Sequence, residues 1–162
     1  GAAFSGKVAR WADHSIENHD LTAVGTEMPS YGISTLNGRN TISFDGINDR
    51  LINTTAAIAG DDYTLFVIFK RDVSTSRDGI IEVGSGGSRN GLWINDVGTQ
   101  KYSYYMNGAF YYSSNTTPVG SYSLVTMTQN STAAEMQVDG TTVMTAVTAA
   151  RVATTGIYVG DD

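Results

Sequence analysis

Two dipeptides, each set between short runs of strand-forming residues, constrain the fold of this chain most strongly. Asn107-Gly108 separates residues 101–106 from 109–113, and Asp139-Gly140 separates residues 135–138 from 141–146. Asn-Gly and Asp-Gly tolerate the positive φ angles of a type I′ turn, whose twist matches that of the flanking strands. The sequence therefore predicts two antiparallel hairpins.

The remainder of the chain also reads as short strands and turns. Residues 63–70 are apolar on both faces, which predicts a strand in the middle of a sheet with both faces largely covered. The one helix that we expect is residues 54–59, which are rich in Ala and closed by Gly60. Further strands are predicted at residues 80–84, 92–95, 121–129 and 157–160.

Composition agrees with an all-β domain and excludes several partners. The 162 residues include 18 Gly, 2 Pro and no Cys, which fits one domain without disulfides. The net charge is −6 with no run of Lys or Arg, so nucleic acid and anionic membrane surfaces are poor partners. No stretch approaches the ~20 apolar residues needed to span a bilayer, so no membrane insertion is expected. A two-sheet antiparallel β-sandwich follows, although the pattern alone does not separate an immunoglobulin-like sandwich from a jelly roll.

The segment from Arg10 to Leu51 carries a recurring order of motifs. It has a Trp-x-Asp-x-Ser start, a His-Asp-Leu-Thr step, a Pro-Ser-Tyr turn and the phrase Ile-Ser-Phe-Asp-Gly-x-Asn-Asp-Arg-Leu. This order, with the apolar strand 63–70 after it, resembles the concanavalin A-like lectin/glucanase superfamily in its laminin-G-like branch. The resemblance extends more weakly to Gly160. It implies a jelly roll over residues 1–162 and a domain that binds ligands at its surface.

The resemblance also implies missing strands. Members of this branch begin with a strand ahead of the Trp11 region and end with a strand after the Val-Gly-Asp step, and the two lie side by side. We therefore expect the 162 residues to be an excerpt of a longer polypeptide that lacks both strands. The alternative is that a neighbouring chain supplies a strand by β-augmentation.

The aromatic residues of the first hairpin are the main candidates for ligand binding. Sugars present flat C–H faces that pack on aromatic rings, while amides and carboxylates bond their hydroxyls. Tyr102 and Tyr104 share one strand face and Tyr105 lies on the other. Packing of half-buried tyrosines across strands explains the same pattern equally well. The predicted ligand site consists of Tyr102, Tyr104, Tyr111, Tyr112, Trp93, Asn95 and Asn107.

The phrase from Phe44 to Asp49 brings oxygen-bearing side chains together beside Gly46. Calcium prefers such oxygen clusters, so Asp45, Asn48 and Asp49 form a candidate calcium site. The alternative, which we favour, is a strand-ending turn in which the side chains bond local backbone amides. Calcium is the only cofactor that the sequence suggests.

Trp11, Asp13, His14 and His19 also form a polar cluster near the N-terminus. Two His without spacing to a third ligand make a weak zinc site. The resemblance instead implies that Trp11 and Asp13 anchor the first loop.

The sequence carries neither the glucanase catalytic pattern nor a nucleophile-elbow sequence. Glucanases of the resembling superfamily use a Glu-x-Asp-x-x-Glu strand, and Glu17, Glu27, Glu82 and Glu135 do not form one.

The leading hypothesis is therefore a non-catalytic, lectin-like adhesion module on an extracellular surface, with a glycan or cell-surface polysaccharide as partner. The alternative is a structural assembly domain of a virion or cell surface, such as a phage decoration, fibre or tail module, that packs against neighbouring subunits. A glycoside hydrolase is a third hypothesis, and it requires flanking segments to bring the carboxylates.

Overall fold

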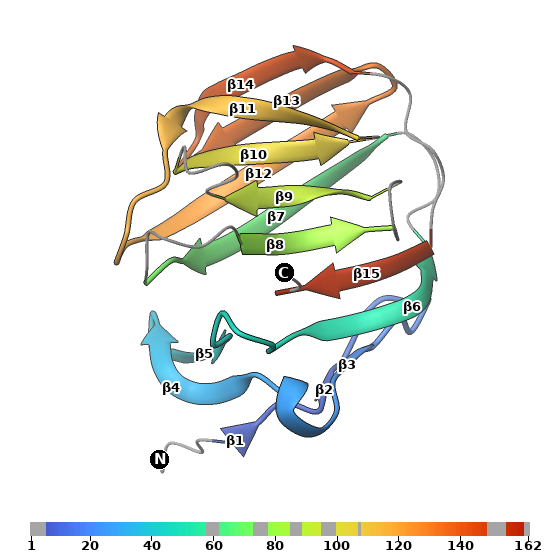
Figure 1. The fold of residues 1–162 in the computed structure, drawn as a ribbon, viewed down its shortest axis with the longest axis vertical. Coiled ribbons are helices and arrows are strands. Elements are labelled where there is room, and N and C mark those ends of the chain that lie inside the picture. Colours follow the sequence, from blue (N-terminus) through green and yellow to red (C-terminus); the bar gives the residue numbers. More distant parts are fainter. Residues whose placement is uncertain are drawn as a thin grey trace.

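Fifteen strands and one 3-10 helix make up the described part of the chain (Figure 1). The computed structural model describes residues 6–57, 62–72, 78–84, 89–94, 100–106, 108–148 and 155–160. Within them, the strands form three antiparallel sheets of eight, four and three strands. No helix in these segments has the length and apolar character needed to cross a membrane.

The eight-stranded sheet has the order β11-β10-β9-β8-β15-β6-β3-β2. Its strands are β2 (Arg10–Trp11), β3 (Leu21–Thr22), β6 (Leu51–Ala57), β8 (Asp78–Val83), β9 (Asn90–Ile94), β10 (Lys101–Met106), β11 (Ala109–Thr116) and β15 (Thr155–Val159). The four-stranded sheet, in the order β14-β13-β12-β7, contains β7 (Tyr63–Lys70), β12 (Tyr122–Asn130), β13 (Ala133–Val138) and β14 (Thr141–Val147). The three-stranded sheet contains β1 (Gly6–Lys7), β4 (Ser30–Leu36) and β5 (Arg39–Ser43), and the 3-10 helix η1 is Gly25–Glu27.

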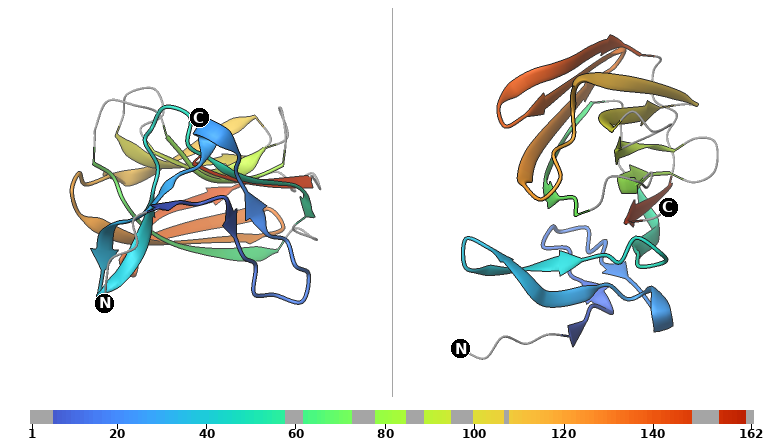
Figure 2. Two further views of the ribbon diagram at one scale, coloured as in Figure 1. Left: turned by 90° about the horizontal axis from the view of Figure 1, so that it is seen from below. Right: turned by 60° about the vertical axis from the view of Figure 1, so that its left-hand side comes forward.

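The eight-stranded and four-stranded sheets pack face to face as a β-sandwich (Figure 2). The core lies between them and draws on both layers: Leu92, Ile94, Tyr102, Tyr104 and Met106 from one, and Val125, Met127, Ala134, Met136, Val143 and Met144 from the other. Alternation along the strands explains most of this arrangement, because every second side chain points into the sandwich. Val143 and Met144 are neighbours, and they lie where the β13–β14 pairing shifts register. The predicted all-β sandwich is confirmed.

Both predicted hairpins are confirmed. Met106 pairs with Ala109 across the first turn, where Gly108 has a φ of 86°, and Asn107 lies outside the described residues. Asp139 and Gly140 have φ angles of 50° and 81°, as a type I′ turn requires. A third hairpin joins β4 to β5 through Asn37 and Gly38, with φ angles of 51° and 74°. Asn37-Gly38 is the same dipeptide as Asn107-Gly108, but we did not predict a hairpin from it.

The predicted helix at residues 54–59 is wrong over residues 54–57, which belong to strand β6; residues 58 and 59 lie outside the described part. Pairing with β15 overrides the helix preference of Ala at these positions. Asn53 and Ala57 lie opposite Ile157 and Thr155, so β6 carries a bulge. The Asn53 side-chain oxygen accepts hydrogen bonds from the backbone amides of Thr55 and Ala56, which stabilises this bulge.

The prediction that residues 63–70 form a central strand with both faces largely covered is also wrong. Strand β7 lies at an edge of the four-stranded sheet and pairs only with β12 among the described strands. Its inward side chains are half-buried, whereas Phe66 and Ile68 on the other face are 68% and 56% exposed. An apolar strand at an open sheet edge is normally covered by a helix, a loop or another strand.

Candidate functional site

Two of the predicted ligand-binding rings lie in the core. Tyr102 and Tyr104 are 1% and 0% exposed. The Tyr102 hydroxyl donates to Ser123 Oγ at 2.9 Å, and the hydroxyls of Tyr104 and Tyr63 are 2.8 Å apart. Burial raises the pKa of Tyr102 above its ordinary value, against a smaller opposing effect of the Ser123 hydrogen bond. Neither ring can stack on a surface ligand, so this part of the predicted site is wrong.

The other predicted site residues fall into three groups. Trp93 is 5% exposed, and Tyr111 packs partly buried against the core with its ring centroid 6.4 Å from that of Tyr104. Tyr112 remains at the surface and is 38% exposed. Asn95 and Asn107 lie outside the described residues.

The opposite face of the same strands carries a cluster of rings on the outer surface of the sandwich. Cross-strand register places Tyr105 opposite Phe110, and Ser103 opposite both Trp93 and Tyr112. The Phe110 ring centroid lies 4.6 Å from that of Tyr105 and 6.0 Å from that of Tyr112, and the Phe110 and Tyr112 planes differ by 19°. The Trp93 ring meets the edge of Phe110 at 6.2 Å. We name Tyr105, Phe110 and Tyr112 the outer aromatic cluster.

An ion pair lies two strands away along the same row of the sheet. The row runs in register from Tyr105 through Gly91 and Glu82 to Tyr158. Glu82 is 1% exposed, and its Oε2 lies 3.0 Å from Nη1 of Arg89, which also lies over the Tyr158 ring at 6.0 Å. Charged groups held in fixed positions beside aromatic rings can orient a polar ligand through hydrogen bonds.

The predicted site mixed the two faces of the first hairpin: it included Tyr112 of the outer face, but also Tyr102, Tyr104 and Tyr111 of the inner face. It left out Tyr105 and Phe110, and it gave Glu82 no role in binding. One signal was available for the face. Met106 shares its strand face with Tyr102 and Tyr104, and an apolar Met on that face indicates that it points into the core. No sequence signal links Glu82 to the rings, because the row depends on the pairing of β8 with β9 and of β9 with β10.

The candidate calcium residues form a closed turn. Asp45 Oδ1 accepts hydrogen bonds from the backbone amides of Ile47, Asn48 and Asp49 at 2.9, 3.1 and 3.2 Å. The first two bonds are the main reason that the pKa of Asp45 lies below its ordinary value. Asp49 Oδ2 accepts from the Asp45 amide, and its Oδ1 lies 3.8 Å from Lys7 Nζ. These contacts support the turn interpretation, and calcium binding stays a prediction.

No group of three or more His, Cys, Asp or Glu side chains gathers as a metal-ligand set in the segments that the structure describes. The loop between β2 and β3 instead uses its carboxylates to bond backbone amides. Asp13 accepts from the Ser15 hydroxyl at 2.6 Å, the Ser15 amide at 2.8 Å and the His19 amide at 2.8 Å. Asn18 takes the left-handed conformation, with a φ of 53°. The predicted anchoring role of Asp13 agrees with these bonds, whereas Trp11 is 47% exposed.

Because of these bonds, we expect the stability of the fold to depend on the protonation of Asp13. The Ser15 side-chain and amide bonds, followed by the His19 amide, lower the pKa of Asp13 from 3.8 to about 2. A carboxyl whose folded pKa is depressed contributes stability above its unfolded pKa of 3.8, and loses it as the pH falls through about 2. Asp13→Asn is expected to lower stability at neutral pH and to remove this acid-dependent component. NMR titration of the Asp13 carboxyl, with acid unfolding of wild type and variant, measures both effects. A midpoint near 3.8 in the folded chain would contradict the prediction.

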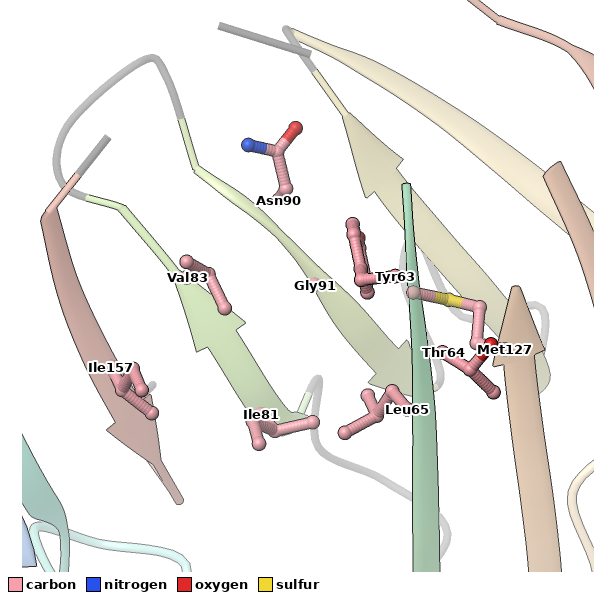
Figure 3. A pocket seen from close by; sticks show the side chains of 9 residues that line it. All are labelled: Tyr63, Thr64, Leu65, Ile81, Val83, Asn90, Gly91, Met127 and Ile157. Atoms are coloured by element: carbon pink, nitrogen blue, oxygen red, sulfur yellow. The ribbon is translucent and has the colours of Figure 1, made fainter. Parts of the chain in front are cut away.

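A cavity of about 200 Å³ lies between the two layers (Figure 3). Apolar side chains from both layers line most of it, including Leu65, Met127, Ile81 and Ile157. Such a cavity offers few hydrogen-bond partners, so it does not suit a polar ligand.

No protein-family model and no curated protein matches the chain at significant similarity. Solved structures do match it, among them the carbohydrate binding module CBM66 from Bacillus subtilis. That match has 15% sequence identity and a TM-score of 0.43, and covers 97% of this chain and 88% of the other. Similarity of this degree assigns neither a family nor a function. The sandwich rests on the sheets described above, and membership of the laminin-G-like branch stays a prediction.

Proposed function

We propose that this chain is a non-catalytic carbohydrate-binding module that binds glycan at the outer aromatic cluster. The observation that carries the proposal is the grouping of Tyr105, Phe110 and Tyr112 on the outer face of β10 and β11. Large apolar rings grouped at a surface commonly mark a binding site. The faces of sugar rings carry C–H groups that pack on aromatic rings, and Tyr hydroxyls supply hydrogen bonds at the same surface.

The environment of the cluster supports this role. The rings belong to two paired strands of the sandwich, so the backbone holds their spacing before a ligand arrives, which lowers the cost of ordering them on binding. The Glu82–Arg89 ion pair follows in the same row and supplies polar partners beyond the rings.

Contacts of the glutamates support a role without hydrolysis. Glu27 pairs with Arg50 at 2.7 Å, Glu82 pairs with Arg89 at 3.0 Å, and Glu135 Oε1 accepts from the side chains of Gln137 and Thr142. Most enzymes that hydrolyse a glycosidic bond use a pair of carboxyl groups that flank the bond, one of them acting as a general acid. These three of the four glutamates lie on different elements, η1, β8 and β13, each with its own partner, and Glu17 lies in the loop between β2 and β3.

Display on a cell or virion surface, and adhesion as the biological use of binding, remain predictions from the sequence. The assembly-domain alternative also remains a prediction, and it needs no ligand at the outer aromatic cluster.

A glycan array tests the proposed function. The folded chain, probed with and without EDTA, is expected to bind a related set of sugars. The double variant Phe110→Ala/Tyr112→Ala is expected to bind them at least about tenfold more weakly, because it removes apolar surface that the sugar covers. Loss of wild-type binding in EDTA would support calcium at Asp45, Asn48 and Asp49.

Tyr31→Ala is the matched control for the double variant. Tyr31 is 40% exposed, close to the 38% of Tyr112, but it lies on β4 in the three-stranded sheet. It should leave the affinity for each sugar unchanged. Equal weakening by Tyr31→Ala and the double variant, or no binding by folded protein to any sugar, would contradict the proposal.

A further inference from the structure

A cavity of about 880 Å³ separates β7 from β5. Figure 2 shows the β4–β5 hairpin beyond the β7 edge of the four-stranded sheet, on the same side of the eight-stranded sheet. Consecutive residues of each strand line the cavity, 40–43 in β5 and 65–70 in β7. Consecutive lining residues mean that strand edges, and not only alternate side chains, face the cavity. We name this cavity the β5–β7 slot.

Both strands lack a partner on the side of the slot within the described part of the chain. β7 pairs only with β12, and β5 pairs only with β4. An edge strand presents a row of N–H and C=O groups that a further strand can pair with. The slot therefore offers hydrogen-bonding groups on two opposite walls.

The floor of the slot is apolar, and so is most of its β7 wall. Ile80 and Ile81 of β8 and Val159 of β15 line it, and all three are only partly buried. Phe66 and Ile68 stand exposed on the outer side of the β7 wall. The inward side chains of a strand in the slot would cover the floor. Its outward side chains would lie beside Phe66 and Ile68.

One end of the slot carries a buried cation. Arg71 directly follows β7, lines the slot and is 5% exposed. Its Nη1 donates to Thr117 Oγ1 at 2.5 Å, but the buried Nε and Nη2 meet no hydrogen-bond partner in the described segments. The other two cations lining the slot lie near carboxylates, Arg50 at Glu27 and Lys70 at Asp72. A buried guanidinium without a carboxylate is costly, and a ligand carboxylate would satisfy it.

We propose that the β5–β7 slot binds an extended strand of a partner polypeptide. The strand pairs with both edges, turns apolar side chains at alternate positions toward the floor, and places a carboxylate against Arg71. It joins the three-stranded and four-stranded sheets into one continuous layer. This proposal is independent of glycan binding, because the outer aromatic cluster lies on the outer face of the opposite layer.

Two synthetic peptides test the proposal. Each is eight residues long, matching β7, and alternates valine with threonine; one carries glutamate at the first position and the other at the last, since strand direction decides which end meets Arg71. Hydrogen exchange of the whole chain is the readout. One peptide is expected to bind and to slow exchange of amides in residues 40–43 and 65–70. The same peptide with a central proline, which removes a backbone donor, is expected to protect neither edge.

Arg71→Met is expected to weaken binding of that peptide by about tenfold or more, because a charge-assisted hydrogen bond is lost. Arg39→Met is the matched control, since Arg39 is an exposed β5 residue that is not among the residues lining the slot, and it should not change the affinity. Replacing the peptide glutamate by glutamine gives the same test on wild-type protein if Arg71→Met fails to fold.

Three outcomes would overturn the proposal. In the first, no peptide protects the two edges. In the second, the proline peptide protects them equally. In the third, a second copy of this chain already covers them, so that they are protected without peptide in a dimer that dilution disperses.

Discussion

Gly91→Ala is expected to destabilise the chain by about 3 kcal/mol or more, which is above the usual cost of overpacking. A Cβ on Gly91 would lie 2.4 Å from the Ile81 carbonyl oxygen and 2.9 Å from Glu82 Cα. Both are backbone atoms of the neighbouring strand β8, so β8 must move away from β9. That movement would disturb the pairing of strands in the middle of the eight-stranded sheet.

Thermal or urea unfolding of the variant measures the loss. For a chain of this size, 3 kcal/mol corresponds to a fall of roughly 6–12 °C in the unfolding midpoint. Gly6→Ala is the control, because a Cβ on Gly6 meets nothing within 4 Å, and it should change the midpoint very little. Equal midpoints for Gly91→Ala and wild type would show that β8 and β9 are not packed as described.

Tyr104→Ala is expected to cost about 3–5 kcal/mol, the range for removing a large buried ring. Tyr104 is fully buried among residues of both layers, and its hydroxyl lies within hydrogen-bond distance of the Tyr63 hydroxyl and 3.1 Å from Met106 Sδ. Tyr104→Phe keeps the ring and loses the hydroxyl, so a smaller cost of about 0.5–1.5 kcal/mol is expected.

Denaturant unfolding of these variants separates a core ring from a surface ring. Tyr112→Ala, at a ring that is 38% exposed, should cost far less than Tyr104→Ala. For glycan binding the order is reversed: Tyr104→Phe should leave affinity unchanged and Tyr112→Ala should lower it. A loss of affinity in folded Tyr104→Phe would return this ring to the ligand site and contradict the assignment of faces.

The fold could largely be predicted because its strongest signals are local. Asp139-Gly140 and Asn107-Gly108 set two hairpins through backbone conformations that few other dipeptides adopt. Residues 54–57 were predicted wrongly because pairing with β15 comes from a segment about a hundred residues away. Local Ala content carries no information on that pairing.

The candidate site could be predicted only in part. Alternation along β10 separates Tyr105 from Tyr102 and Tyr104, yet alternation does not by itself say which face is buried. The edge position of β7 also could not be predicted from the sequence. Its apolar residues 63–70 indicate that other residues cover both faces of this strand. The sequence does not say whether those covering residues belong to this chain.

NMR of the aromatic side chains during titration with an array-selected glycan tests the glycan-binding proposal most directly. Ring signals of Tyr105, Phe110 and Tyr112 are expected to shift with the sugar concentration. Ring signals of Trp11, Tyr31 and Phe66, which line the β5–β7 slot, are expected to stay unchanged. Shifts confined to the slot rings, with the outer aromatic cluster unaffected, would contradict the account and place sugar binding at the slot.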